Sequence, residues 1–491
     1  MLSAINHCRV LTAPVVTQQV RAMSTIRKNE RNIGIKGIEV YFPRTYVAQS
    51  DLEAYDGVSA GKYTKGLEQQ AMAFTSDRED ITSMALTSFT NLMRNNDVDY
   101  KDVGFLSVGT ETLVDKSKST KSVLMQQFSE SGNYDVQGVD SINACYGGTA
   151  AIMNAINYIE TSDDYDGRDA VVVTGDIAVY EKGAARPSGG AGIVSLLIGP
   201  NAPLAYDRGV TGTHMEHVHD FYKPVLNSEY AVVDGHLSID CYLRALAGAY
   251  NTYKQRYARV HGDNFSLDKA DYSLFHCPFG KLVRTSYAWL AYLDYVERPA
   301  DPRFSGVPDK FMGLGIGAEA YGNKELLLTF RDLVKSDYES KVVPSLLLNQ
   351  QLGNSYTGSL YMSLASLLSQ KSSAELQQKR INMFSYGSGM AATLFSLKVV
   401  GDTSKIAMND RVHEKLAQRV QMSAQEFTDT LDLRERTHNL NDYTPVGDIG
   451  MLFPGSYYNE YIDSKYRRQY KQVPLQGTVD YAENEKILSQ A

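Results

Sequence analysis

The segment Asn143-Ala-Cys-Tyr-Gly-Gly-Thr-Ala-Ala151 contains the residue best suited to chemistry, Cys145. A strand-like run, Val139–Ala144, precedes the cysteine, and small residues that favour the start of a helix follow it. At a strand-to-helix turn, free N–H groups and the helix dipole stabilise a thiolate, the nucleophilic form of cysteine. The alternative is a buried structural cysteine, packed as a small hydrophobe. Gly147 and Gly148 favour the nucleophile, because glycines let a substrate approach closely.

Two titratable residues elsewhere lie at the ends of strand-like runs. Glu111 follows Val103–Gly109, and His276 closes Ser273–His276. Ligand crevices of α/β proteins form at the carboxyl ends of parallel strands, so both residues are candidates for a site. Each also has an ordinary interpretation, as an exposed loop glutamate and a structural histidine. They are far apart in the sequence, so only folding can bring them together.

Short β-branched runs alternate with helical patterns from residue 32 onwards. This alternation predicts an α/β fold with a mostly parallel sheet that is covered on both faces. Gly199, Pro200 and Pro203 predict a boundary between two similarly built halves near 201–207. The strand candidates are Ile33–Tyr41, Val103–Gly109, Val139–Ala144, Ala170–Gly175, Ser273–His276, Arg380–Ser385 and Leu394–Val400, and the helix candidates include Asp80–Met93 and Lys281–Leu293.

Length and composition limit the class of protein. With 491 residues, 43% hydrophobic and 22% charged, the chain is too long for one ordinary domain and too apolar for intrinsic disorder. A net charge of −8 argues against broad binding to nucleic acid or to a membrane surface. No apolar stretch approaches the roughly 18 residues of a membrane span. Four scattered cysteines, Cys8, Cys145, Cys241 and Cys277, predict a reducing compartment without a disulfide framework.

The N-terminus differs in composition from the rest of the chain. It has no Asp or Glu before Glu30, whereas Arg9, Arg21, Arg27 and Lys28 are basic. An acid-poor, arginine-bearing N-terminus is typical of transit peptides, and it predicts that residues 1–23 direct import into the mitochondrial matrix. The alternative is a disordered tail on a cytosolic protein.

Several motifs in a fixed order resemble those of hydroxymethylglutaryl-CoA synthases, most closely the eukaryotic ones. The resemblance runs from about residue 33 to residue 480. Besides the segment around Cys145, it is carried by Val172–Tyr180, Ala185–Gly190, Gly212–Met215, Asp220–Pro224, Phe275–Val283, Gly353–Thr357, Phe384–Gly389 and Leu452–Gly455. It implies a thiolase-like fold with five layers, αβαβα, made of two related halves with mixed, mostly parallel sheets. The halves would be residues 32–204 and residues 205–485, the second with insertions, in a homodimer.

The resemblance implies a condensing acyltransferase. Its substrates would be acetyl-CoA, acetoacetyl-CoA and water, and its products (3S)-3-hydroxy-3-methylglutaryl-CoA and CoA. Cys145 would carry the acetyl group, Glu111 would be the general acid and base, and His276 would bind and polarise the acetoacetyl carbonyl. Coenzyme A thioesters are substrates here, so no cofactor is implied. The same chemistry feeds mevalonate, isoprenoid and sterol synthesis or ketone-body formation, and the sequence does not choose between them.

The resemblance also implies residues that hold the substrates. The backbone N–H groups of Cys145 and Ser388 would form an oxyanion hole. Contacts to CoA or to the acyl groups would come from Lys281, Asn354, Ser388, Ser188, Ser238, Tyr356 and His214. The histidines His214, His217 and His219 fit no strong zinc pattern, so no metal site is predicted.

Some positions depart from the family pattern. Ala184 replaces Asn, Ser188 replaces Thr, Thr285 replaces a frequent Lys, and Cys277 and Gly280 replace Ser and Cys. These departures put the strength of CoA binding in question. Two other hypotheses stay open: a thiolase or ketoacyl-synthase type of enzyme, and a catalytically silent protein of the same fold. A thiolase would need a second catalytic cysteine near the C-terminus, and none follows Cys277.

Overall fold

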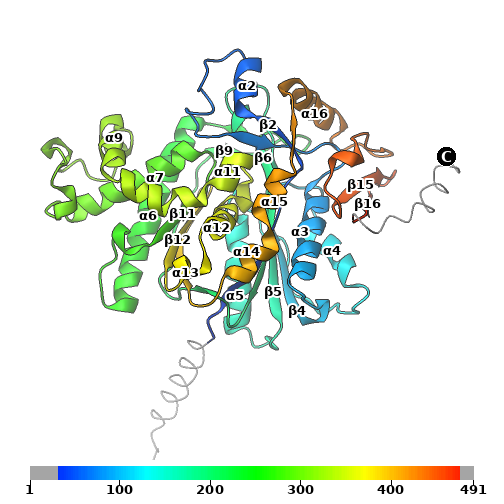
Figure 1. Cartoon of the computed structure of the whole chain (residues 1–491), viewed down its shortest axis with the longest axis horizontal. Coiled ribbons are helices and arrows are strands. Elements are labelled where there is room, and N and C mark those ends of the chain that lie inside the picture. The colour runs from blue at the N-terminus through cyan, green and yellow to red at the C-terminus, as the bar shows by residue number, and fades with distance from the viewer. Residues whose placement is uncertain (1–30, 476–491) are drawn as a thin grey trace, which may run out of the picture.

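The computed structural model describes residues 31–475 and is built around one large mixed β-sheet (Figure 1). Its strands are β1 (Gly34–Tyr41), β4 (Val103–Gly109), β5 (Asp169–Ala178), β6 (Gly190–Gly199), β7 (Leu204–Tyr206), β8 (Gly212–Met215), β11 (Tyr272–Phe275), β12 (Arg380–Gly387) and β13 (Ala391–Val399). Their order across the sheet is β11-β12-β13-β7-β1-β6-β5-β4, with β8 beside β13. The short strand β7 joins the strands of the first half to those of the second.

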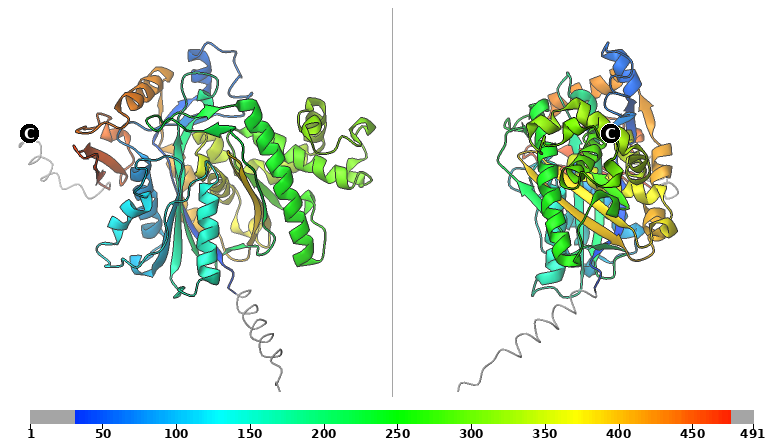
Figure 2. Two further views of the ribbon diagram at one scale, coloured as in Figure 1. Left: turned by 180° about the vertical axis from the view of Figure 1, so that it is seen from behind. Right: turned by 90° about the vertical axis from the view of Figure 1, so that its left-hand side faces the viewer.

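Helices cover both faces of the sheet and also lie between its two halves. The long helices are α3 (Ile81–Asn95), α5 (Gly147–Thr161), α6 (Gly235–His261), α7 (Gly280–Glu297), α12 (Ser359–Gln370) and α16 (Ala424–Thr437). Helices α5 and α12 lie between β4–β5 on one side and β11–β12 on the other, while α3 and α6–α7 form the outer layers (Figures 1 and 2). This is the expected five-layered αβαβα arrangement.

The alternation of side chains along the strands builds these layers. In β5, Val172 packs into the central core with α5 and α12, whereas Val171 and Val173 pack into the outer core with α3. In β12, Met383 faces the central core and Phe384 faces the outer core of α6 and α7. Successive strand residues point to opposite faces, so each strand supplies two cores at once.

Shorter elements surround this framework. Small sheets are formed by β2 (Thr45–Ala48), β3 (Ala71–Ala73) and β14 (Val420–Met422), by β9 (Phe221–Tyr222) and β10 (Val232–Val233), and by β15 (Tyr457–Ile462) and β16 (Arg468–Gln472). The shorter helices are α2 (Gln49–Tyr55), α4 (Thr120–Leu124), α8 (Ala318–Tyr321), α9 (Lys324–Leu333), α10 (Lys335–Lys341), α11 (Leu347–Leu352), α13 (Ser373–Leu376), α14 (Ser404–Asp410) and α15 (Val412–Ala417). No helix among residues 31–475 is long and apolar enough to cross a membrane.

The sequence predictions hold for most elements, and two of them are wrong. Only two pairs in the large sheet are parallel, β4 with β5 and β11 with β12, so its pairing is mostly antiparallel. The reason is that β5–β6 and β12–β13 are joined without an intervening crossover helix, which makes those neighbours antiparallel. The run Val139–Ala144 is not a buried strand: Val139 and Ile142 are exposed, and the segment pairs with β4 through an isolated bridge between Ser141 and Gly109 and not as a continuous strand.

Other expectations about the chain's organisation remain predictions. The proposed boundary between residues 32–204 and residues 205–485 falls inside β7. The proposed transit peptide, residues 1–23, and Cys8 lie outside the described residues, as do residues 476–485.

Helix α5 packs unusually close to the sheet because its first turn is made of glycines. A Cβ atom added to Gly148 would lie 1.9 Å from Thr174 Oγ1 and 2.8 Å from the carbonyl oxygen of Thr357. A Cβ atom on Gly109, at the end of β4, would lie 2.4 Å from Gly148 Cα. These glycines therefore set the distance between α5 and the sheet. That distance in turn sets the position of Cys145, which lies two residues before the helix.

We expect Gly148→Ala to destabilise the fold by about 1–3 kcal/mol, because the added methyl group must displace strand β5 or the backbone at Thr357. Denaturant unfolding of the purified protein measures this. Gly306→Ala is the matched control, since a Cβ atom there meets nothing within 4 Å. Equal unfolding midpoints for the two variants would contradict the close packing of α5.

Candidate active site

A cavity of about 460 Å³ opens where the ends of strands from both halves meet. Most residues predicted to bind substrate border it. Its lining includes Cys145, Ser188, Ser238, His276, Asn354, Tyr356 and Ser388, together with Tyr180, Ala184, Phe221, Tyr242 and Tyr386. The walls are mainly aromatic and apolar, and a few polar groups converge on one end, as is usual in pockets that bind small molecules.

Cys145 lies on a strained turn at the base of this cavity. The preceding residue, Ala144, has a positive φ of 41°, which is uncommon for a residue with a side chain. Gly387 at the end of β12 makes room for the turn, because a Cβ atom there would lie 2.5 Å from the backbone nitrogen of Tyr146. Ala144 in the first half of the chain and Gly387 in the second thus fix the position of the thiol. The Cys145 side chain remains partly accessible.

Glu111 is next to the thiol. Its Oε1 atom lies 4.0 Å from Cys145 Sγ, close enough to accept a weak sulfur hydrogen bond. Glu111 lies two residues beyond the end of β4, and this position places its side chain beside the cysteine that precedes α5. The structure therefore brings together two residues that the sequence analysis assigned to one reaction.

The loop that carries Glu111 is organised by a buried carboxylate, Asp176 in β5. Its Oδ1 atom accepts hydrogen bonds from the backbone nitrogens of Glu111 (2.8 Å) and Thr112 (2.9 Å) and from the hydroxyl group of Thr110 (2.6 Å). Its Oδ2 atom accepts from the backbone nitrogen of Thr357 at 3.0 Å. Asp176 thus joins the Glu111 loop to the segment that contains Tyr356.

Burial controls the protonation of the thiol and the carboxyl group. Desolvation raises the pKa of Cys145 well above its ordinary value, and the nearby Glu111 and Asp176 carboxyl groups raise it further. Desolvation also raises the pKa of Glu111 to about 7, with Asp176 adding to the effect and Lys223 opposing it. Burial and the two neighbouring carboxyl groups thus oppose the stabilisation of the thiolate that a helix start was expected to give Cys145.

His276 faces the same cavity from the end of β11, and it is uncharged. Burial lowers the pKa of its imidazole to about 3. The main chain holds it in place: its N–H donates to Phe384 O at 2.8 Å, and its carbonyl oxygen accepts from the Tyr242 hydroxyl group at 2.6 Å. A neutral imidazole in this position can donate a hydrogen bond to a substrate oxygen without adding a positive charge.

Comparisons with known proteins agree with this geometry. Two family models match consecutive parts of the chain, "Hydroxymethylglutaryl-coenzyme A synthase N terminal" over residues 29–203 and "Hydroxymethylglutaryl-coenzyme A synthase C terminal" over residues 204–473. The chain belongs to the hydroxymethylglutaryl-CoA synthase family.

Curated relatives extend over nearly the whole chain. It is 49% identical to hydroxymethylglutaryl-CoA synthase A of Dictyostelium discoideum, with 91% of this chain and 92% of the relative covered. It is 45% identical to a mitochondrial hydroxymethylglutaryl-CoA synthase of Sus scrofa (96% and 94% covered) and 46% identical to a cytoplasmic one of Pongo abelii (90% and 88% covered). Among solved structures, MvaS in complex with 3-hydroxy-3-methylglutaryl coenzyme A matches with a TM-score of 0.79 and 32% identity, covering 90% of this chain and 99% of that one.

Two residues expected to contact substrate do not line the cavity of this family member. Lys281 begins helix α7 and its side chain is exposed at the surface, while its backbone nitrogen donates to Leu67 O at 3.0 Å. Leu67 itself lines the cavity, so Lys281 lies beside the rim. His214, in β8, pairs with Glu216 at 2.7 Å and packs against Gly248 of α6. Among residues 31–475, no group of three or more His, Cys, Asp and Glu side chains could hold a metal ion.

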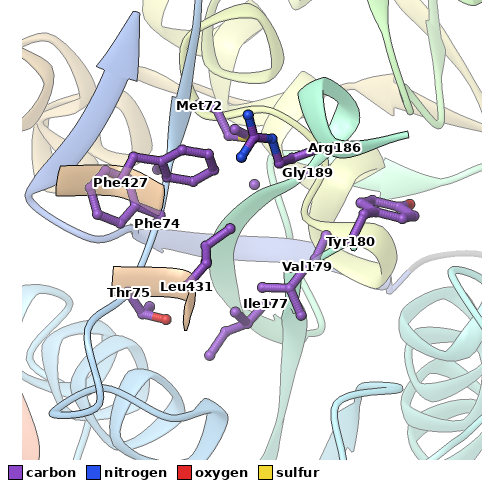
Figure 3. Close-up of a pocket in the computed structure, with 13 residues that line it drawn as sticks. Met72, Phe74, Thr75, Ile177, Val179, Tyr180, Arg186, Gly189, Phe427 and Leu431 are labelled. Atoms are coloured by element: carbon purple, nitrogen blue, oxygen red, sulfur yellow. The ribbon is translucent and has the colours of Figure 1, made fainter. Parts of the chain in front are cut away.

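A second pocket lies behind the wall formed by Tyr180 (Figure 3). Its volume, about 10 Å³, is that of a single water molecule, so it is no substrate site. Arg186 borders it, forms an ion pair with Asp56, and lies over the ring of Phe427 in α16 at 5.8 Å. This contact anchors the segment between β5 and β6 that carries Tyr180 and Ser188 into the main cavity.

Sequence reasoning missed Asp176 as a site residue. The signal was present, because the Val-rich run Ala170–Gly175 ends at this aspartate. A carboxylate at the end of a buried strand needs hydrogen-bond donors, and its neighbours must supply them. One of these donors, the backbone nitrogen of Thr357, lies 181 residues further along the chain. No local sequence pattern reveals such a partner.

We expect the rate of any reaction that uses Glu111 as a base to fall as the pH drops through about 7, since the carboxyl group is then protonated. His276, with its pKa of about 3, should add no second transition near neutral pH. The dependence of kcat/KM on pH measures both effects. The transition should disappear in Glu111→Gln and persist in His276→Gln; a transition that is lost in the histidine variant would contradict the neutral imidazole.

Proposed function

We propose that the chain condenses acetyl-CoA with acetoacetyl-CoA and water to form (3S)-3-hydroxy-3-methylglutaryl-CoA and CoA. The observation that carries the proposal is that Cys145 and His276 line one cavity, with Glu111 Oε1 4.0 Å from the Cys145 thiol, in a member of this family. The structural relative at 32% identity is described as a complex with 3-hydroxy-3-methylglutaryl coenzyme A, the product of this reaction.

In the first step, Cys145 attacks the carbonyl carbon of acetyl-CoA. The bond from that carbon to the sulfur of CoA breaks, and CoA leaves as a thiol with the proton that the cysteine loses. The backbone N–H groups of Cys145 and Ser388 would stabilise the oxyanion, because Ser388 borders the cavity at the end of β12. Asp220 supports this turn by accepting from the backbone nitrogen of Gly389 at 2.9 Å.

In the second step, the Glu111 carboxylate takes a proton from the methyl group of acetyl-Cys145. The resulting carbon nucleophile attacks the ketone carbon of acetoacetyl-CoA, and Glu111 returns its proton to the new alkoxide. A pKa of about 7 suits a group that must both accept and donate a proton near neutral pH. His276 would donate a hydrogen bond to the ketone oxygen as negative charge develops there.

In the third step, water hydrolyses the thioester between Cys145 and the new acyl group. The product leaves as the CoA thioester contributed by acetoacetyl-CoA, with a free carboxylate at its other end, and the cysteine thiol is regenerated. Ser188, Ser238, Asn354 and Tyr356 would hold the substrates, because they line the same cavity as Cys145. All bonds and protons balance with the three substrates, so no step requires a cofactor.

A homodimer is supported by an apolar strip beside the catalytic turn. The segment that borders β4 at the edge of the sheet exposes Tyr134 (70%), Val139 (67%) and Ile142 (59%), and Leu113 is also exposed (46%). Several large apolar side chains exposed near the edge of a sheet are characteristic of an interface. We infer that a second copy covers it and so supports the turn that holds Cys145.

The relatives occur in two compartments, mitochondrial in one case and cytoplasmic in another. The acid-free N-terminal stretch supports the mitochondrial matrix for this chain, with the cytosol as the alternative. The product is an intermediate for either mevalonate-based isoprenoid and sterol synthesis or ketogenesis.

We expect Cys145→Ser to abolish the transfer of radiolabelled acetyl groups from acetyl-CoA to the protein, because a hydroxyl group is a far weaker nucleophile than a thiol. Cys241→Ser and Cys277→Ser are matched controls, since both thiols are buried and should leave labelling unchanged. Persistent labelling of the Cys145 variant would refute the assignment of the nucleophile.

We expect Glu111→Ala to be acetylated but to lose condensation by at least about 100-fold, the scale of a lost general base. Removing the Glu111 charge takes away one of the groups that raise the pKa of Cys145, so acetylation should not suffer. Mass spectrometry of the acetyl adduct and a spectrophotometric assay of acetoacetyl-CoA consumption separate the two steps. Normal condensation by this variant would place the base elsewhere.

A further inference from the structure

Lys223 follows β9 and lies half-buried beside the catalytic cavity. Strand β9 pairs with β10, and this hairpin borders the cavity through Phe221 and Val233. The motif Asp220–Pro224 contains the lysine, but neither the family resemblance nor the mechanism above uses its side chain. Its position next to the reacting groups calls for a physical explanation.

Two aromatic rings fix the ammonium group of Lys223. Its nitrogen lies 4.8 Å from the centre of the Tyr356 ring and 5.9 Å from the centre of the Phe221 ring. Both rings line the cavity, and Tyr356 is only 1% exposed. A cation over the face of an aromatic ring is attracted to it, and more strongly when water is excluded. The charge is therefore held in place at the cavity wall.

The ammonium group has no carboxylate of its own. Within the described part of the chain it forms no ion pair within 4.0 Å and no hydrogen bond with a protein atom. The lysine Lys182, on the segment between β5 and β6, contrasts with it, since its nitrogen lies 2.9 Å from Asp432. A surface ion pair cancels most of the field of Lys182, whereas the field of Lys223 extends into the site.

The charge of Lys223 acts on acidic groups from several elements. They are Glu111 beyond β4, Asp176 in β5, Glu229 between β9 and β10, and the Cys145 thiol before α5. Of these, Glu229 already pairs with Arg434 at 2.9 Å. Tyr180 and Tyr356 line the cavity beside these groups. The ionised forms of the two carboxyl groups and the thiol would repel one another, and a positive charge at the cavity wall offsets this repulsion.

We propose that Lys223 is a positioning residue for the condensation, a fixed positive charge that favours the ionised forms of Glu111 and Cys145 at the moments when each must lose a proton. The inference rests on the proposed function. In agreement with it, the charge of Lys223 lowers the pKa of both groups, against the effects of burial and of Asp176. Tyr356 serves as the platform that keeps this charge beside the site without neutralising it.

The test is the pH dependence of turnover in Lys223→Met, which keeps the length and apolar stem of the side chain but removes its charge. We expect the transition near pH 7 to move to higher pH, because the pKa of Glu111 rises without the lysine. Turnover at neutral pH should be about tenfold lower and should recover as the pH is raised. The KM for acetyl-CoA should not change.

Three comparisons make the test specific. Lys223→Arg should keep the wild-type pH profile, because it keeps the charge. Lys182→Met removes a lysine whose charge is paired at the surface and should also leave the profile unchanged. The acetyl adduct on Cys145 of the unmodified protein is measured in parallel by mass spectrometry, so that failure of the proposed function is distinguished from failure of this inference.

An unchanged pH profile in Lys223→Met would overturn the inference. A higher KM with the same profile would also overturn it, because Lys223 would then bind substrate. A loss of turnover that does not recover at any pH, in a variant with the wild-type circular dichroism spectrum, would assign the lysine to packing over Tyr356 instead. If the unmodified protein formed no acetyl adduct, the proposed reaction itself would be refuted.

Discussion

The burial of one imidazole and the partial burial of one carboxyl group and one thiol form the constraint on which the site depends. Burial makes the charged form of each group costly, so Glu111 and Cys145 hold their protons more tightly and His276 gives its proton up. Near neutral pH the Glu111 carboxyl group is therefore partly ionised, whereas the His276 imidazole is uncharged.

Such a site needs a rigid frame, because its reacting groups come from segments that are far apart in the sequence. Asp176 supplies part of it by accepting hydrogen bonds from the Glu111 loop and from Thr357, two segments that are remote in sequence. The glycines of α5 supply another part, since they let the helix lie against Thr174 and so fix the distance of the Cys145 turn from the sheet. The polar network and the close packing converge on the same few residues.

The sequence predicted the chemistry better than the topology. The roles of Cys145, Glu111 and His276 were inferred from the family motifs, and the structure places Cys145 and His276 at one cavity with Glu111 beside the cysteine. The antiparallel pairing was missed, because β-branched runs look alike whichever way a strand runs. The run Val139–Ala144 was misread for a related reason: its apolar residues face outward at an edge of the sheet, where a local pattern cannot distinguish an interface from a core.

Electrostatic partners were the least predictable part of the site. Asp176 and Lys223 act on Glu111 from β5 and from the β9–β10 hairpin, and neither lies near it in the sequence. Their effects have opposite sign, since the aspartate raises the pKa of Glu111 and the lysine lowers it. Only the folded arrangement determines which effect is larger.

The departures from the family pattern fit together in the folded chain. A Cβ atom on Gly280 would lie 2.8 Å from the carbonyl oxygen of Glu68, so glycine at this position lets the loop that carries Leu67 approach the start of α7. Arg284 then pairs with Glu68 at 2.8 Å and fastens the loop there. Cys277 is almost fully buried, and burial raises the pKa of its thiol, which makes it a poor target for oxidation. Gly280 and the Arg284–Glu68 ion pair thus hold the loop around Leu67 against the start of α7, at the rim of the cavity.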